Sequence, residues 1–238
     1  LVVARLQNSQ KEVLRSEKLA SIGQLAAGTA HEIRNPLMSI KLLVQAALRD
    51  EGDDPLSRDD LTLIEREISR VEATVRNLLE FAKPQALNRK HFHVRELLDY
   101  CLSLVAGRAA IQGIPIRYDY SHEDVMAEGD FDQLHQVILN LLLNALDAMT
   151  NEGEILIRIN VLSDQGEFLE LSVDDMGVGI QGEKLGDMFE PFMSTKESGT
   201  GLGLSISKRI IEDHGGKMFA YNKSKGCTVG FRLPLHSI

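Results

Sequence analysis

The chain has 238 residues and a formal net charge of −9 at pH 7, from 26 basic against 35 acidic side chains. A negative balance excludes the nonspecific nucleic-acid binders, which need a basic surface. The length suits one large or two ordinary domains, and a hydrophobic fraction of 43% predicts a globular chain. Only two cysteines occur, Cys101 and Cys227, far apart in the sequence. This favours a reducing compartment over a disulfide framework.

No apolar run is long enough to span a bilayer, and no signal peptide is present, so we expect a cytoplasmic location. The chain starts without Met and opens directly into helical sequence. We interpret it as a piece of a longer protein, which leaves open an upstream sensor or membrane anchor.

The first third of the chain predicts helices with coiled-coil seams. Residues 1–18 keep the heptad poorly, and we interpret them as an incoming signalling helix. Small and apolar residues then recur at alternating steps of four and three, at Leu19, Gly23, Ala26, Ala30, Ile33, Leu37, Ile40, Val44 and Ala47. Turn formers between Asp50 and Pro55 end this helix.

A second seam follows with the same alternation, at Leu61, Ile64, Ile68, Val71, Val75, Leu78 and Ala82, and Lys83-Pro84 ends it. Two seamed helices joined by a short loop predict an antiparallel hairpin over residues 19–88. One hairpin covers both stripes poorly, so pairing of two copies into a four-helix bundle, a homodimer, is the economical solution. The alternative is a bundle within one chain, packed on the downstream domain.

Residues 89–238 predict a second domain of mixed structure. We expect helices over 94–107, 131–149 and 202–213, and strands over 114–118, 154–162, 168–174, 217–222 and 227–233. This mixture predicts the α+β class, with helices over one face of a mixed sheet. The stretch 177–200 has little periodicity, which is typical of a functional lid or a disordered loop.

His31 is a candidate nucleophile on the first helix. It follows the seam residue Ala30, so it lies on the flank of the stripe, where its neutral imidazole has a lone pair for attack. Glu32 is placed to accept a proton from the imidazole, and Asn35 lies on the same helical face. Pro36 lacks an amide and loosens the helix. The alternative is a plain surface histidine, while Asn35 in place of a second His excludes a zinc protease.

Two asparagines on the apolar helix 131–149 are candidate metal ligands. Asn140 and Asn144 lie four residues apart, on one face, and amide oxygens at that spacing can meet Mg²⁺. The alternative is that Asn144 is a buried polar group bonded to the backbone.

A glycine-punctuated region is a candidate nucleotide pocket without a P-loop motif. Asp175 ends a predicted strand, where its carboxylate could accept the exocyclic amine of adenine, and Gly177 and Gly179 would let a flat base approach; strand-end turns often look the same. Backbone amides opening the helix at 202 favour phosphate, and Lys196 could neutralise its charge. The residues of this second loop are Gly199, Thr200, Gly201, Leu202 and Gly203.

Together these segments resemble the sensor histidine kinases of two-component systems, from about residue 18 to the C-terminus. Five motifs occur in the order of that family. They are similar to its H box (His31–Leu37), N box (Asn140–Ala145), G1 box (Asp175–Ile180), F box (Phe189–Phe192, followed by 194–196) and G2 box (Gly199–Ser205). The H box is similar to that of nitrogen-regulator kinases.

The resemblance implies a dimeric phosphoacceptor hairpin followed by a Bergerat-type ATP-binding α/β sandwich. It implies that ATP and Mg²⁺ bind, with Asn144 and Asn140 at the metal and Asp175 at adenine. His31 would be phosphorylated with help from Glu32 and would pass the phosphoryl group to the receiver domain of a response regulator. Asn35 would position water for dephosphorylating that partner. The alternatives are an ATPase of the gyrase or chaperone class and a non-catalytic nucleotide-binding scaffold.

Overall fold

The computed structural model describes residues 33–48, 56–82, 87–120, 125–149, 153–163, 166–191, 193 and 201–235. These residues form two compact units, one on each side of residue 84. The predicted order, a helical hairpin followed by an α+β domain, is confirmed. The predicted domain boundaries at 18/19 and 88/89 stay predictions. None of the described helices is long and apolar enough to cross a membrane.

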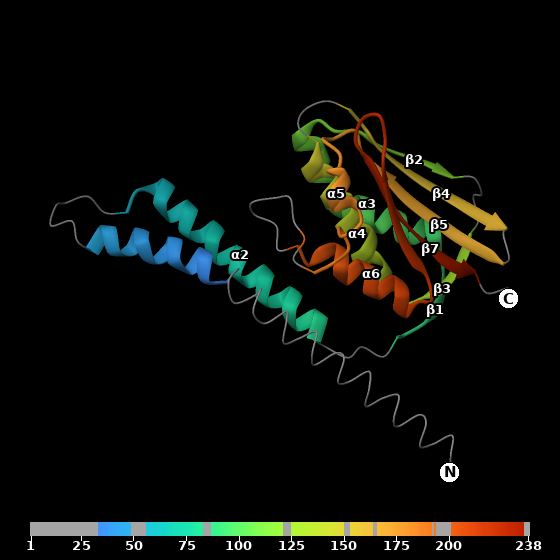
Figure 1. The fold of residues 1–238 in the computed structure, drawn as a ribbon, viewed down its shortest axis with the longest axis horizontal. Helices are drawn as coiled ribbons and strands as arrows, with labels where there is room; N and C mark the ends of the chain where they lie inside the picture. The colour runs from blue at the N-terminus through green and yellow to red at the C-terminus, as the bar shows by residue number, and fades with distance from the viewer. Residues whose placement is uncertain are drawn as a thin grey trace, which may run out of the picture. The chain divides into compact units, whose positions relative to one another are not determined.

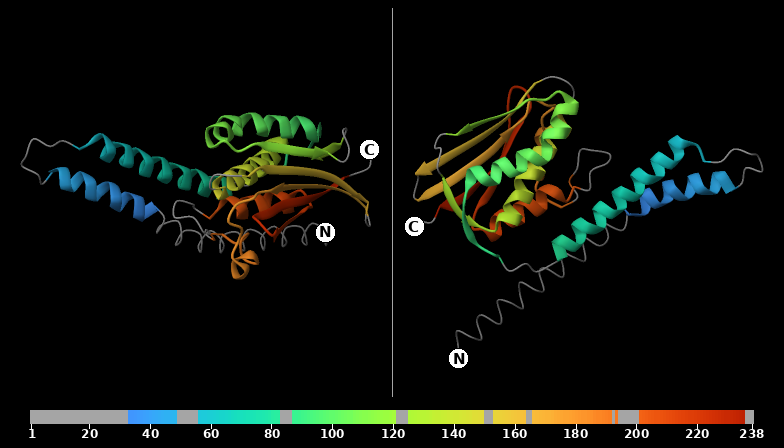
Figure 2. Two further views of the ribbon diagram at one scale, coloured as in Figure 1. Left: turned by 90° about the horizontal axis from the view of Figure 1, so that it is seen from above. Right: turned by 180° about the vertical axis from the view of Figure 1, so that it is seen from behind.

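The first unit is an antiparallel pair of helices (Figures 1 and 2). One covers residues 33–48, and the other is α2, Arg58–Ala82. A reciprocal cap starts α2: the Ser57 hydroxyl accepts from the Asp60 amide at 3.1 Å, and the Asp60 carboxylate accepts from the Ser57 amide at 3.1 Å. This capping box satisfies two backbone donors that would otherwise have no partner in the helix.

The second unit is built on a five-stranded sheet with strand order β2-β4-β5-β7-β6. Only β2 and β4 are parallel, and the other neighbours are antiparallel. The strands are β2 Ile116–Tyr120, β4 Ile155–Ser163, β5 Glu167–Asp174, β6 Lys217–Asn222 and β7 Cys227–Leu235.

Three helices cover one face of this sheet: α3 Val94–Gln112, α4 Phe131–Ala148 and α6 Gly203–Asp213 (Figures 1 and 2). Alternation along the strands divides the two faces. On β5 the buried apolar residues Leu169, Leu171 and Val173 belong to the core face. The other face carries polar pairs such as Glu170 with Arg232. One face of the sheet is therefore built for the helices and the other for ion pairs.

The structure adds three short elements to those predicted. β1, Lys90–His93, pairs with β3, Met126–Gly129, and a single-turn helix α5 covers Gly182–Leu185. Four residues give too little periodicity to detect. The predicted helix 94–107 continues to Gln112, because Gly107 is accommodated inside it and Gly113, with φ +67°, ends it.

Candidate functional site

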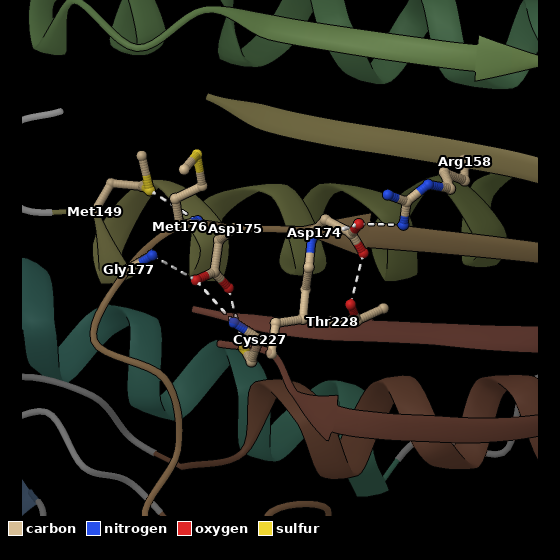
Figure 3. A network of polar contacts seen from close by, with 9 residues as sticks. Met149, Arg158, Asp174, Asp175, Met176, Gly177, Cys227 and Thr228 are labelled. Carbon is tan, nitrogen blue, oxygen red and sulfur yellow. Dashed lines mark hydrogen bonds and ion pairs between the residues drawn. The ribbon is translucent and has the colours of Figure 1, made fainter. Parts of the chain in front are cut away.

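Asp175 is a buried carboxylate immediately after β5, only 3% exposed. Its Oδ1 accepts from the amides of Gly177 at 2.8 Å and Cys227 at 3.3 Å, and its Oδ2 accepts from the Cys227 thiol at 3.0 Å (Figure 3). The amide of Asp175 donates in turn to the carbonyl of Cys227 at 3.0 Å. Two elements far apart in sequence therefore fix the orientation of this side chain.

The Cys227 thiol is a donor that sequence analysis did not identify. Burial raises its pKa most, and its hydrogen bond to Asp175 and the charges of Asp175 and Asp174 raise it further. The thiol therefore stays protonated, and it donates a hydrogen bond to Oδ2 of Asp175. A carboxylate oxygen can accept two hydrogen bonds, and among the described residues the thiol is the one donor to Oδ2.

The neighbouring carboxylate, Asp174, is also buried but is used differently. It accepts from the Thr228 hydroxyl at 2.7 Å and pairs with Arg158 (Figure 3). It also pairs with Lys223 at 3.1 Å. Two cations compensate the negative charge of Asp174, and the Thr228 hydroxyl adds a hydrogen bond. Asp174 therefore holds the end of β5 in place, while Asp175 faces the opposite side of the sheet.

Gly177 is required by close packing on α4. A Cβ at this position would lie 2.4 Å from the carbonyl oxygen of Ala148, so any side chain would push the loop away from the helix. Next to it, the amide of Met176 donates to Sδ of Met149 at 3.3 Å. Gly179 has φ +69°, which L-residues with side chains rarely adopt. The loop after Asp175 is thus held against the C-terminal end of α4.

Asn140 and Asn144 lie on α4 next to the start of α6. Asn140 Nδ2 donates to the Ser207 hydroxyl at 2.9 Å, and Asn144 Nδ2 donates to Asn140 Oδ1 at 3.4 Å. A Cβ on Gly203 would lie 2.5 Å from Asn140 Oδ1, so this glycine lets α6 approach the asparagine amide. The sequence therefore correctly placed both asparagines on one helix face, and the structure joins that face to the second glycine loop.

The start of α6 is anchored independently. Gly201 has φ +64°, and Leu202, fully buried, provides the carbonyl that accepts from the Ser205 hydroxyl at 2.9 Å. At the far end of α6, the Nε2 atom of His214 accepts from the amide of Asp130 at 2.9 Å, and Asp130 caps α4. Both ends of α6 are thereby tied into the second unit.

Five predicted site residues lie outside the described residues: His31, Glu32, Lys196, Gly199 and Thr200. Asn35 lies in the described helix 33–48 and is exposed, while Pro36 is buried. The described part of the site therefore consists of the asparagines on α4, the loop after β5 and the start of α6.

Two family models match the chain. Residues 21–87 match the His Kinase A (phospho-acceptor) domain. Residues 129–237 match the histidine kinase-, DNA gyrase B- and HSP90-like ATPase. The first range contains His31 and Asn35, and the second contains the asparagines and both glycine loops, so the second unit is an ATP-binding domain of this class.

Curated relatives match along almost the whole chain. The sensor histidine kinase ZraS of Klebsiella oxytoca is 37% identical over 98% of this chain and 51% of its own length. Sporulation kinase A of Bacillus subtilis is 36% identical over 90% of this chain and 34% of its own length. The chain thus spans about half or less of these relatives.

Solved structures agree with these matches. Histidine kinase ThkA, in complex with the response regulator protein TrrA, superposes with a TM-score of 0.83 at 32% identity, over 96% of this chain and 66% of that one. The separate catalytic domain of ThkA is 34% identical and is covered to 96%, over 62% of this chain, with a TM-score of 0.57. With a phosphoacceptor hairpin, an ATPase domain and relatives of one kind over the whole chain, the protein belongs to the sensor histidine kinases of two-component systems.

Proposed function

We propose that this chain transfers the γ-phosphoryl group of ATP to His31 and passes it to an aspartate of a response regulator. The observation that carries the proposal is the buried Asp175 carboxylate, which three donors orient beside a glycine loop. A carboxylate oxygen that accepts one hydrogen bond can accept a second, and a primary amine such as the exocyclic amine of adenine is a suitable donor. A charge-assisted hydrogen bond of this kind contributes roughly 1.5–3 kcal/mol.

Magnesium ion is a further part of the proposal, and the side chains on α4 fit it. The oxygen ligands that Mg²⁺ prefers are supplied here by Asn144, with Asn140 beside it. Ser207 takes the amide nitrogen of Asn140 as a donor, so the oxygen of that amide is directed away from Ser207. Mg²⁺ would neutralise phosphate charge, which is the main requirement of phosphoryl transfer.

The phosphates would lie at the second glycine loop. Backbone amides at the start of α6 attract anions, and Gly201 and Gly203 have no side chains that would cover those amides. Gly199, Thr200 and Lys196 precede them in sequence, and Lys196 would add a positive charge.

The transfer itself needs a nucleophile and a proton acceptor on the hairpin. An imidazole nitrogen of His31 attacks the γ-phosphorus, the bond to the β–γ bridging oxygen breaks, and ADP leaves. Glu32 accepts the imidazole proton. In the second step the P–N bond breaks as an aspartate carboxylate of the regulator takes the phosphoryl group. Asn35, exposed on its helix, would position a water that hydrolyses the phosphoaspartate.

A homodimer is also proposed, on the exposure of the seam. Among the described seam residues of both helices, alternate residues are half-buried and the others are exposed. The exposed set is Leu37, Val44, Leu61, Ile68 and Val75. A second copy of the hairpin would cover this stripe by forming a four-helix bundle.

We propose a response regulator as the partner because of the similarity to ThkA. ThkA was solved together with a response regulator, and a receiver domain is the partner we infer for this chain.

The test is autophosphorylation with γ-phosphate-labelled ATP and Mg²⁺. The label should be lost in acid and retained in base, as expected for a phosphoramidate, and His31→Gln should abolish it while nucleotide binding persists. ATP hydrolysis without labelling would instead support the gyrase- or chaperone-class ATPase. Nucleotide binding without either reaction would support the non-catalytic scaffold.

A further inference from the structure

The turn between β6 and β7 contacts the loop that follows Asp175. Asn222, the last residue of β6, accepts from the amide of Ile180 through Oδ1 at 2.9 Å. Its Nδ2 donates to the carbonyl of the same Ile180 at 2.6 Å. One side-chain amide thus satisfies both backbone groups of a single loop residue.

This contact has the chemistry of strand pairing, in which one residue exchanges both its amide and its carbonyl with a partner. Ile180 lies beyond the end of β5, and the Asn222 amide takes the place of a strand partner. The preceding residue, Gly179, has φ +69°, and a Cβ there would lie 3.3 Å from both Asn222 Oδ1 and the carbonyl oxygen of Gly226. The loop and the turn are therefore in direct contact.

The turn that carries Asn222 is itself fixed to the end of β5. The Lys223 amide donates to the Gly226 carbonyl at 3.1 Å, and the Lys223 ammonium pairs with Asp174 at 3.1 Å. Gly226, with φ +77°, packs so closely on the Asp175 carbonyl that a Cβ would lie 2.1 Å from its oxygen. Asn222 thus reaches the loop from a base that is anchored beside Asp175.

We infer that Asn222 is a positioning residue for nucleotide binding: it holds the Gly177–Ile180 loop in the conformation that receives the base. The inference rests on the proposed function, since it concerns the same nucleotide site. Asn222 acts through the backbone of Ile180. Only a primary amide offers a donor and an acceptor at the spacing that both backbone groups require.

The exposure of Asn222 separates positioning from folding. The side chain lies at the surface, where water replaces lost hydrogen bonds, so its removal leaves the fold intact. Removal of the side chain, however, breaks the two hydrogen bonds that Asn222 makes with the backbone of Ile180 in the loop. In the variant, part of the binding free energy of the nucleotide is then used to order the loop. The affinity should therefore fall, while the thermal unfolding midpoint changes little.

The experiment uses the full chain and measures the Kd of Mg-ADP by titration calorimetry. Asn222→Ala, which loses both bonds, should bind about tenfold more weakly. Asn222→Ser keeps a hydroxyl able to make one of the two bonds and should fall between Ala and native. Lys225→Ala is the matched control, an exposed residue of the same turn, and should bind like the native chain. The thermal midpoint of each variant should stay within about 3 °C of native.

Two further readouts distinguish positioning from a general loss of structure. In the nucleotide-free Asn222→Ala variant, the Ile180 amide should exchange with solvent faster, while the amides of β5 should keep their protection. In autophosphorylation the KM for ATP should rise and the rate at saturating ATP should be retained.

Several results would overturn the inference. If Asn222→Ala binds Mg-ADP with native affinity, the inference about Asn222 is wrong, and the proposed function is not affected. Loss of cooperative unfolding in both Asn222 variants would make the residue part of the fold. Failure of the unaltered chain to bind Mg-ADP would instead overturn the proposed function, and this inference with it.

Discussion

Negative charge on the exposed half of the hairpin seam should separate the proposed homodimer. Ile68 and Val75 lie seven residues apart on α2 and are 46% and 38% exposed. In a four-helix bundle these side chains would be buried against the partner copy, so Ile68→Glu with Val75→Glu would place four carboxylates per dimer in an apolar interface.

The structure gives the size of the effect. Five of the described seam side chains are exposed in each copy, between 37% for Val44 and 53% for Leu61. Full burial of such a side chain contributes about 1.5–3 kcal/mol, so covering the exposed half contributes about 1 kcal/mol each. Ten side chains then contribute on the order of 10 kcal/mol, similar to the cost of association.

The net free energy of dimerisation is therefore small compared with the loss that the double substitution causes. The double substitution loses about 4 kcal/mol of apolar burial, which alone is a factor of about a thousand in Kd. Desolvation of the carboxylates adds to the loss.

The assay is sedimentation velocity of the full chain at micromolar concentration, with circular dichroism to verify that α2 remains helical. The matched control is Thr62→Glu with Ser69→Glu, an exposed pair on the same helix with the same spacing of seven but off the seam. The native chain and the control should sediment as dimers and the seam variant as a monomer. A seam variant that remains dimeric, or a control that dissociates equally, would refute this interface.

Four other outcomes are expected. Asp175→Ala should weaken Mg-ADP binding about 10- to 100-fold by removing the adenine acceptor, and unchanged calorimetric affinity would place the pocket elsewhere. Cys227→Ala should weaken the same binding by a smaller factor, with partial recovery in Cys227→Ser, since a hydroxyl also donates to Asp175; equal affinities would contradict a role for the thiol proton. Asn35→Ala should slow regulator dephosphorylation more than autophosphorylation, and Glu32→Ala should do the reverse; time courses that fall in parallel would remove this division. The free energy of unfolding should fall as the pH rises above 9: burial raises the pKa of Cys101 from 9.0 to about 12 and also raises that of Cys227, so both thiols ionise first in the unfolded chain. Urea titrations at pH 7 and pH 10 measure this, and equal stability would contradict it.

The long elements of the second unit could be predicted because their periodicity is strong. The predicted helix 131–149 is α4 to within a residue, and the predicted strand 168–174 is β5. Boundaries failed where a local signal was ambiguous: the predicted helix 94–107 stops five residues short of the end of α3, and the backbone geometry identifies Gly113 as its cap. The β1–β3 pair could not be predicted, since each strand buries very few side chains.

The candidate site divides in the same way. Asp175, Gly177 and Gly179 are contiguous, so a single motif contains them. Their supports come from elsewhere in the chain: Cys227 follows Asp175 by 52 residues, and Asn222 follows Ile180 by 42. No local pattern marks an ordinary Cys or Asn at the end of a strand, because its role depends on the pairing of β7 with both β5 and β6.

The two adjacent aspartates show how strand register assigns chemistry that composition leaves undecided. Neighbouring residues point to opposite faces of a sheet, so the sequence Asp174-Asp175 places one carboxylate on each side. The register pairs Asp174 with Thr228, on the face where Arg158 and Lys223 compensate its charge. Asp175 falls on the helix side, where the donors that reach it from the described residues are neutral. A carboxylate whose charge is not balanced by one of these donors keeps its attraction for an external donor, and for this reason we propose Asp175, and not its neighbour, as the residue that binds the nucleotide.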